Sequence, residues 1–134
     1  MYLLDTDICS YLMENRHSKV RDHLRAVPPE SVAISAITQG EILFGFAWKE
    51  VGLNRRLAAK TFFESVQVLD WPAIASLIYG RLRAALKKAG EDIGLNDCMI
   101  ASHAIALDAI LVTNNTRHFV RIGPELHLEN WLES

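Results

Sequence analysis

The sequence predicts an α/β fold, a three-layer α/β/α sandwich with a mainly parallel central sheet of about five strands. Short apolar runs alternate along the chain with longer segments of helical character. Strands that are separated by helices imply right-handed crossovers and parallel pairing. The short runs at residues 2–4, 32–34 and 109–113 are almost entirely apolar, as expected for strands covered by helices on both faces.

The first half of the chain contains two of these strands, residues 2–4 and 32–34, and four predicted helices. The first two helices span residues 8–14 and 19–26, and Pro28 and Pro29 end the second because proline cannot continue a helix. Either Ser35 or Thr38 can cap a third helix that extends to about residue 49. Gly52 ends that helix, and a fourth spans residues 54–64.

The second half begins with a strand at residues 66–69 and continues with two helices and two further strands. Pro72 suits the first turn of a long helix that reaches residue 88 and is closed by Gly90. Another helix opens at residues 94–97 and extends to about residue 107. The last strands are residues 109–113 and 126–128.

Length and composition indicate one globular domain, residues 1–134, in the cytoplasm. The chain has 134 residues, of which 50% are hydrophobic and 22% charged, a normal globular mixture. Its two cysteines suit a reducing compartment, and neither a signal peptide nor a membrane-spanning segment is recognisable.

The net charge of −2 argues against a protein that simply coats nucleic acid. Basic clusters occur near residues 16–21, 55–60 and 81–88, and they are able to contact phosphates. For any one cluster, a solvated helix face is the simpler interpretation. The individual candidates for phosphate contacts are Arg16, Lys19, Arg81 and Lys87.

Polar side chains occur where predicted strands end and where two apolar helices begin. In parallel sheets, ligands bind beyond the carboxyl ends of the strands. Two acids follow the first strand, two amides follow the fourth, and one acid lies in the opening turns of each apolar helix. These residues are Asp5, Asp7, Asn114, Asn115, Glu41 and Asp97.

Carboxylates in such apolar surroundings require a partner that neutralises them. No lysine or arginine lies nearby in sequence to pair with Glu41 or Asp97, whereas one divalent cation would serve several acids together. Oxygen-only ligands favour Mg²⁺, with Mn²⁺ as the alternative ion. Such a site hydrolyses nucleic-acid phosphodiester bonds with metal-held water. Taken singly, an acid such as Glu41 or Asp97 more often stabilises a helix N-terminus than binds a metal; the combination of the acids indicates the metal site.

Four motifs resemble those of PIN-domain ribonucleases of the VapC toxin family, and they occur in the family's order across essentially the whole chain. They are YLLDTD (residues 2–7), ISAITQGEI (34–42), GLNDCMIA (94–101) and LVTNN (111–115). The resemblance implies a PIN-like fold and a metal-dependent endoribonuclease. It also implies that Asp5, Glu41 and Asp97 form the metal-holding cluster, with Asp5 and Asp97 as the most direct ligands.

Two positions depart from the family pattern. Asp7 stands where many relatives carry asparagine, and we interpret it as a cap of the first helix. Asn115 stands where many PIN nucleases have a fourth acid; an amide still orients a water but adds no charge. The resemblance therefore implies one metal ion rather than two, with Asn115 included among the catalytic residues and Thr113 helping to position a water.

The family also implies partners. Its toxins are inhibited by a cognate VapB-like antitoxin, form homodimers and contact DNA only through the antitoxin. Their substrates are RNAs, and for this chain transfer RNA is one hypothesis. The resemblance implies no membrane association.

Two other functions remain open at this level. One is a catalytically weak PIN-like binding subunit of an antitoxin complex, supported by the missing fourth acid. The other is a receiver-like Mg²⁺-binding signalling domain, in which Asp70 would accept the phosphoryl group.

Overall fold

A computed structural model of the chain describes residues 1–133 and contains one parallel sheet of five strands. The strand order is β3-β2-β1-β4-β5, and every neighbouring pair is parallel. The strands are β1 (Tyr2–Leu4), β2 (Val32–Ser35), β3 (Gln67–Leu69), β4 (Ile110–Val112) and β5 (His127–Glu129). The predicted α/β class and the predicted number of strands are confirmed.

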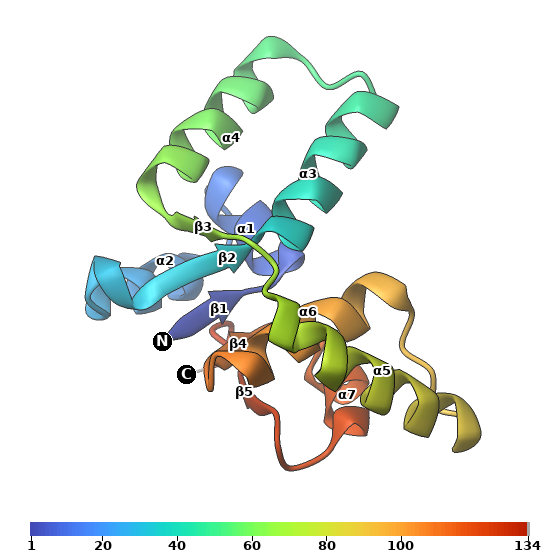
Figure 1. Cartoon of the computed structure of the whole chain (residues 1–134). Helices are drawn as coiled ribbons and strands as arrows, with labels where there is room; N and C mark the ends of the chain where they lie inside the picture. The colour runs from blue at the N-terminus through green and yellow to red at the C-terminus, as the bar shows by residue number, and fades with distance from the viewer. Residues whose placement is uncertain (134) are drawn as a thin grey trace.

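Helices cover both faces of this sheet (Figure 1). They are α1 (Thr6–Met13), α2 (Ser18–Ala26), α3 (Ala36–Trp48), α4 (Leu53–Ser65), α5 (Ala73–Lys88), α6 (Leu95–Ala106) and α7 (Thr116–Phe119), with short 3₁₀ turns at Pro29–Ser31 and Val120–Ile122. Figure 1 shows α3 and α4 as a helical hairpin on one side of the molecule and α5 with α6 on the other.

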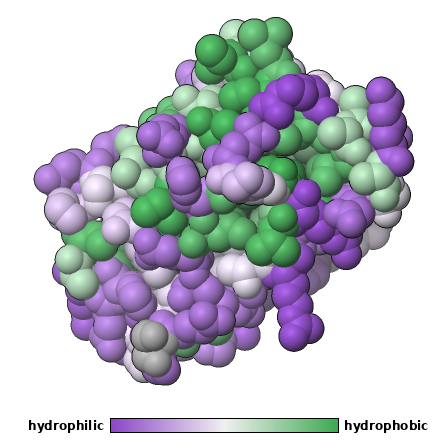
Figure 2. Space-filling view, turned by 90° about the horizontal axis from the view of Figure 1, so that it is seen from below, coloured by the Kyte–Doolittle hydropathy of each residue, from purple (hydrophilic) through white to green (hydrophobic). Residues whose placement is uncertain are grey.

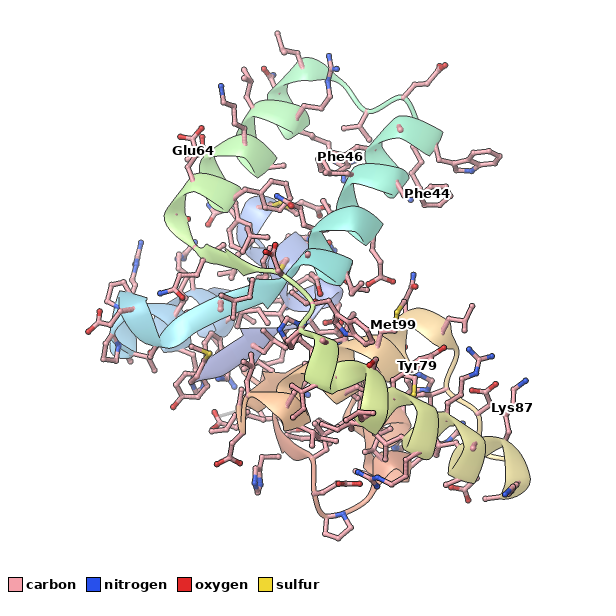
Figure 3. The ribbon with its side chains drawn as sticks, viewed as in Figure 1. Phe44, Phe46, Glu64, Tyr79, Lys87 and Met99 are labelled. Atoms are coloured by element: carbon pink, nitrogen blue, oxygen red, sulfur yellow. The ribbon has the colours of Figure 1, made fainter. Side chains whose placement is uncertain are left out.

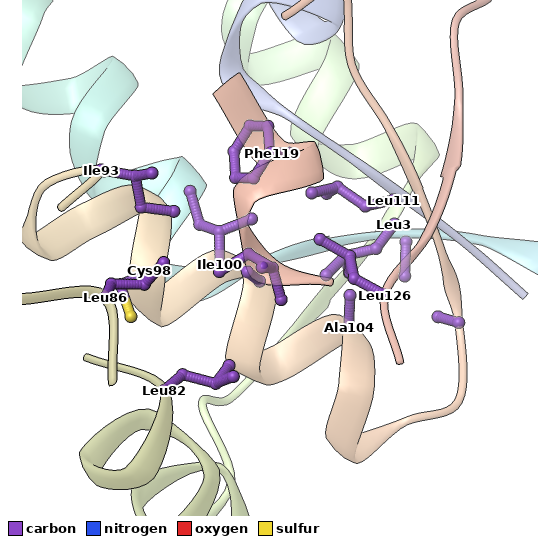
Figure 4. Close-up of a cluster of buried hydrophobic side chains, with 14 residues drawn as sticks. Leu3, Leu82, Leu86, Ile93, Cys98, Ile100, Ala104, Leu111, Phe119 and Leu126 are labelled. Carbon is purple, nitrogen blue, oxygen red and sulfur yellow. The ribbon is translucent and has the colours of Figure 1, made fainter. Parts of the chain in front are cut away.

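Two buried clusters hold the layers together because successive side chains of a strand point to opposite faces. Leu3 belongs to the cluster formed with α5 and α6, which Figure 4 shows with Leu82, Ile100 and Phe119 around it. Leu4, the next residue, belongs to the cluster on the α1, α2 and α4 side. The short apolar strands are therefore buried on both faces, as the sequence predicted.

Most element boundaries agree with the sequence, and the differences are small. Ser35, rather than Thr38, caps α3, since its hydroxyl accepts a hydrogen bond from the Ile37 N–H. Pro72 occupies the N-cap position of α5 instead of its first turn. Strand β4 is shorter than predicted, β5 begins at His127, and the short helix α7 was not predicted.

The strand order places a crevice between β1 and β4, because the chain adds β2 and β3 on one side of β1 and then β4 and β5 on the other. Ligands of open parallel sheets bind at this kind of switch point, beyond the carboxyl ends of the strands. Asp5 follows β1 and Thr113 follows β4, so both lie at the crevice. Asp70 follows β3 at the edge of the sheet. A receiver domain carries its phosphoryl acceptor at the end of a central strand, so this position does not fit the receiver interpretation.

Candidate active site

Asp5 is the buried centre of the site, with only 6% of its surface exposed. It caps α1: its Oδ1 accepts a hydrogen bond from the Thr6 N–H at 2.8 Å. The Thr113 hydroxyl donates to Oδ2 at 2.9 Å. Burial, reinforced by the charges of Asp7 and Asp97, raises the pKa of Asp5 from 3.8 to about 7. The protein therefore holds a carboxylate whose charge it does not neutralise.

Asp7 lies close to Asp5 and connects the first turn of α1 to the loop after β4. Its Oδ2 accepts a hydrogen bond from the Asn114 N–H at 3.1 Å, and its Oδ1 accepts one from the Ile8 N–H. Burial raises the pKa of Asp7, and the charge of Asp97 adds to this effect. The prediction that Asp7 caps the first helix is wrong, because Asp5 occupies the N-cap position.

Asp97 lies in the first turn of α6 and is held by a histidine. The Oδ2 atom of Asp97 lies 2.9 Å from His118 Nε2, which also lies 3.1 Å from the Ile93 carbonyl oxygen. Both of these neighbours are acceptors, so the geometry requires a proton on Nε2. One carboxylate oxygen of Asp97 is thus held by α7, which leaves Oδ1 without a hydrogen bond among the described residues.

Glu41 projects from α3 and is held through both of its oxygens. The Thr6 hydroxyl donates to Oε1 at 2.7 Å, and the Asn96 amide donates to Oε2 at 3.2 Å. Thr6 directly follows Asp5 and Asn96 directly precedes Asp97, so Glu41 links the two segments that carry the aspartates. Through these two hydrogen bonds, Glu41 fixes the two segments relative to each other.

Asn115 contributes through its backbone. Its N–H donates to Thr113 Oγ1 at 3.0 Å, while the same hydroxyl donates to Asp5. Its carbonyl oxygen accepts the first hydrogen bonds of α7, including that of the His118 N–H. Asn115 therefore connects the Asp5 end of the site to the helix that carries His118.

The predicted residues thus meet at one end of the sheet, but as a hydrogen-bonded network. Within residues 1–133, no group of three or more His, Cys, Asp or Glu side chains is arranged to hold a metal ion. Asp5, Glu41 and Asp97 instead each direct at least one oxygen to a protein donor. No lysine or arginine among the described residues pairs with any of these acids.

Shallow pockets open at this network. One of about 340 Å³ is lined by Glu41, Asn96 and Asp97, and another of about 570 Å³ by Glu41, Thr6 and Phe44. Figure 3 shows Phe44 on the side of α3 opposite to Phe46, which points towards α4. Glu41 and Asp97 are therefore accessible from solvent along the groove between α3 and α6, whereas Asp5 lies buried behind them.

Three residues of the network were not selected from the sequence. Thr6 and Asn96 adjoin predicted acids, so proximity in sequence could have suggested them. His118 lies 21 residues from Asp97 and in a helix of its own, so no local pattern in the sequence links the two.

Residues 2–124 match the family model described as PIN domain. The chain therefore belongs to the PIN-domain family, which confirms the resemblance found in the sequence. It is 37% identical to "Ribonuclease VapC2" of Rickettsia felis, over 98% of both chains. It is 34% identical to "tRNA(fMet)-specific endonuclease VapC" of Shigella flexneri, over 97% of both chains.

The fold agrees with a solved structure of a VapC-type relative. The VapBC2 complex from Rickettsia felis, bound to a DNA fragment from its promoter, contains a chain that superposes with a TM-score of 0.88 at 36% identity. The match covers 97% of this chain and 98% of that one. Within the PIN-domain family, the chain thus groups with the VapC proteins.

Proposed function

We propose that the chain is an endoribonuclease, the toxic component of a type II toxin–antitoxin system. The observation that carries the proposal is the meeting of Asp5, Asp97 and Glu41 at the β1–β4 crevice of a PIN domain. The names of the relatives, ribonucleases and a tRNA-specific endonuclease, support RNA as the substrate. Transfer RNA is accordingly the first substrate to test.

A divalent cation, Mg²⁺ or Mn²⁺, fits the chemistry of the donor set. The buried Asp5 carboxylate has a raised pKa and no lysine or arginine partner among the described residues, and the two side chains that would hold the ion, Asp5 and Asp97, offer carboxylate oxygens only. Magnesium binds through one or two carboxylates and keeps several waters, so Asp5 and Asp97 suffice as ligands and a third acid is not required. Bound there, the ion would supply a hydroxide nucleophile and stabilise charge on the phosphate.

The chain's own residues have separate roles in this proposal. Asp5 and Asp97 provide the negative charge, and His118 and Thr113 orient their carboxylates. Glu41 keeps the starts of α1 and α6 together through Thr6 and Asn96. Asn115 orients Thr113 through its N–H. With an amide at position 115, the site carries charge for one ion rather than two.

Cleavage of transfer RNA by the purified chain tests this function. We expect cutting with Mg²⁺ and none with EDTA. Asp5→Asn and Asp97→Asn should each abolish cutting and also Mg²⁺ binding measured by calorimetry, while circular dichroism stays unchanged. Asp108→Asn is the control, because Asp108 is exposed at the far end of α6. Normal cutting by Asp5→Asn or Asp97→Asn would show that the chemistry lies elsewhere.

The proposed partners are a VapB-like antitoxin and a second copy of the chain. Several solved relatives are VapBC complexes, which supports an antitoxin for this chain, with DNA contacted only through it. Large apolar side chains are exposed on the α3–α4 hairpin; they are Leu43, Phe44, Trp48, Leu53 and Leu57. Exposed apolar surface of this kind marks protein interfaces. Within residues 1–133, no helix combines the length and apolar character needed to cross a membrane.

A catalytically weak binding subunit is the second candidate. The amide at position 115 favours it. Mg²⁺ binding without cleavage of any RNA in a cellular pool would support this alternative over the nuclease.

A further inference from the structure

A second pocket adjoins the candidate active site and carries basic side chains. Its volume is about 280 Å³, and it is lined partly by Thr6 and Glu41, which belong to the acidic network. Its cationic side chains are Arg16, Lys49 and Arg55, and we call it the basic pocket. The acidic network and the basic pocket are adjacent, because they share Thr6 and Glu41. A nucleic-acid backbone bound at one would therefore extend into the other.

Two of these cations converge on a single carboxylate. Arg16 Nε lies 2.8 Å from Glu14 Oε2, and Arg55 Nη2 lies 2.9 Å from Glu14 Oε1. Two guanidinium charges therefore meet one carboxylate. With Lys49 and Glu41 included, the lining carries three cations and two carboxylates, which leaves a net positive charge. Both arginine side chains remain more than half exposed, at 52% and 56%.

Aromatic rings hold the two guanidinium groups in position. Arg16 lies 5.0 Å from the centroid of the Tyr11 ring, and Arg55 lies 6.0 Å from that of Phe46. Figure 3 shows Phe46 pointing from α3 towards α4. Stacking of this kind restricts the guanidinium while leaving its donors available. The arginines are therefore preorganised for an oxyanion.

We propose that the basic pocket binds a phosphate of the RNA strand next to the scissile phosphate, and that Glu14 partly masks it. This inference rests on the proposed function. The acidic network by itself repels a polyanion, so cations beside it are needed to draw the backbone in. Arginine binds phosphate through paired N–H donors. The shared lining with the active site favours RNA over an acidic segment of a protein partner.

The test measures binding of a short fluorescein-labelled single-stranded RNA of mixed sequence by anisotropy, in EDTA, with RNA integrity checked on a gel. We expect the double variant Arg16→Ala/Arg55→Ala to raise the Kd about tenfold and to reduce the salt dependence of binding. Glu14→Gln should lower the Kd about threefold, because it unmasks the guanidinium groups.

Matched controls are Arg121 and Glu30, which are exposed, lie in the two short 3₁₀ turns and do not line the basic pocket. Arg121→Ala and Glu30→Gln should leave the Kd unchanged. If circular dichroism shows that the double variant does not fold, Lys49→Ala and Glu14→Gln still test the proposal. We expect a higher Kd for Lys49→Ala and a lower Kd for Glu14→Gln.

An unchanged Kd in the folded double variant, or a higher Kd for Glu14→Gln, would overturn the proposal. Loss of binding to an antitoxin with unchanged RNA affinity would overturn it too, and would assign the pocket to a protein partner. A wild-type chain that neither binds nor cuts RNA would instead refute the proposed function.

Discussion

Burial of Asp5 next to two other aspartates raises its pKa from 3.8 to about 7. When no cation is present, the ionised carboxylate therefore destabilises the folded chain. A raised pKa means that the folded chain retains a proton which the unfolded chain has lost. Stability therefore falls as the pH rises from about 4 to about 7, by roughly 4 kcal/mol in total. Burial shifts the pKa of Asp7 in the same direction. In the proposed function, a bound cation would offset this loss of stability, because it would neutralise the carboxylates.

Asp5→Asn should therefore stabilise the metal-free chain while abolishing activity. In EDTA at about pH 8 we expect a higher Tm than for the wild type, and the difference should shrink by more than half at about pH 5, where the Asp5 carboxyl is protonated. Added Mg²⁺ should raise the Tm of the wild type only. Thermal unfolding followed by circular dichroism measures both effects. A lower Tm for the variant at both pH values would contradict this account.

His118 is predicted to position Asp97. Removal of its Nε2–H donor in His118→Ala frees the Asp97 carboxylate, and loss of such a supporting contact lowers metal affinity about tenfold. His118→Gln, which retains a donor, should recover most of the affinity. His127→Ala is the matched control, since His127 forms an exposed pair with Asp108 at 3.8 Å. Calorimetry with Mn²⁺ measures the metal affinities. Equal affinities for His118→Ala and the wild type would show that His118 does not position Asp97 for metal binding.

At the scale of elements, the start of α6 depends on one backbone conformation. Gly94 has a φ of 91° and occupies the N-cap position of the helix that carries Asn96 and Asp97. Its N–H donates to Asp92 Oδ1, and its carbonyl oxygen accepts from the Cys98 N–H. This φ is disfavoured for residues with a Cβ. The glycine thus sets the direction from which the two site residues enter the pocket.

Gly94→Ala should destabilise the chain by about 1 kcal/mol or more, because the left-handed backbone is strained with a side chain. Gly80→Ala provides the opposite result: Gly80 lies inside α5, has nothing within 4 Å of an added Cβ, and should gain about 0.5–1 kcal/mol. Urea unfolding measures both changes. A loss of stability for Gly80→Ala as large as that for Gly94→Ala would contradict the backbone argument.

At the scale of the whole molecule, several large apolar side chains are exposed. On the face that Figure 2 shows, apolar side chains lie next to one another and are bordered by hydrophilic ones. Phe44 and Trp48 are 67% and 77% exposed on α3, and their rings stack with centroids 6.2 Å apart. A chain of 15.1 kDa that exposes such side chains next to its active-site groove is suited to pairing with another copy.

We expect the purified chain to be a dimer by light scattering, and Trp48→Glu to shift it to the monomer while its circular dichroism spectrum stays unchanged. A charge at this position removes apolar contact area and is not buried in the isolated chain, so stability should change by less than about 0.5 kcal/mol. Val120→Glu is the control, because Val120 is 60% exposed in another element and should leave the dimer intact. A monomeric wild type would refute the expectation.

The sequence by itself determined the alternation of strands and helices, the doubly covered sheet and the acids that follow or open those elements. These features depend on local pattern: apolar runs at residues 2–4 and 32–34, and breaks at Pro28 and Gly52. Where two caps were equally consistent with the pattern, as for Ser35 and Thr38, only the tertiary packing chose between them.

Only the tertiary structure determined which groups of the site form hydrogen bonds with one another. It assigned the N-cap to Asp5 rather than Asp7, occupied both oxygens of Glu41 and brought His118 to Asp97. It also joined Arg55 to Glu14 across 41 positions of sequence. The physical reason is that a hydrogen bond between distant residues requires atoms placed to within a few tenths of an ångström. That placement follows from how whole helices pack on the sheet, which no local pattern encodes.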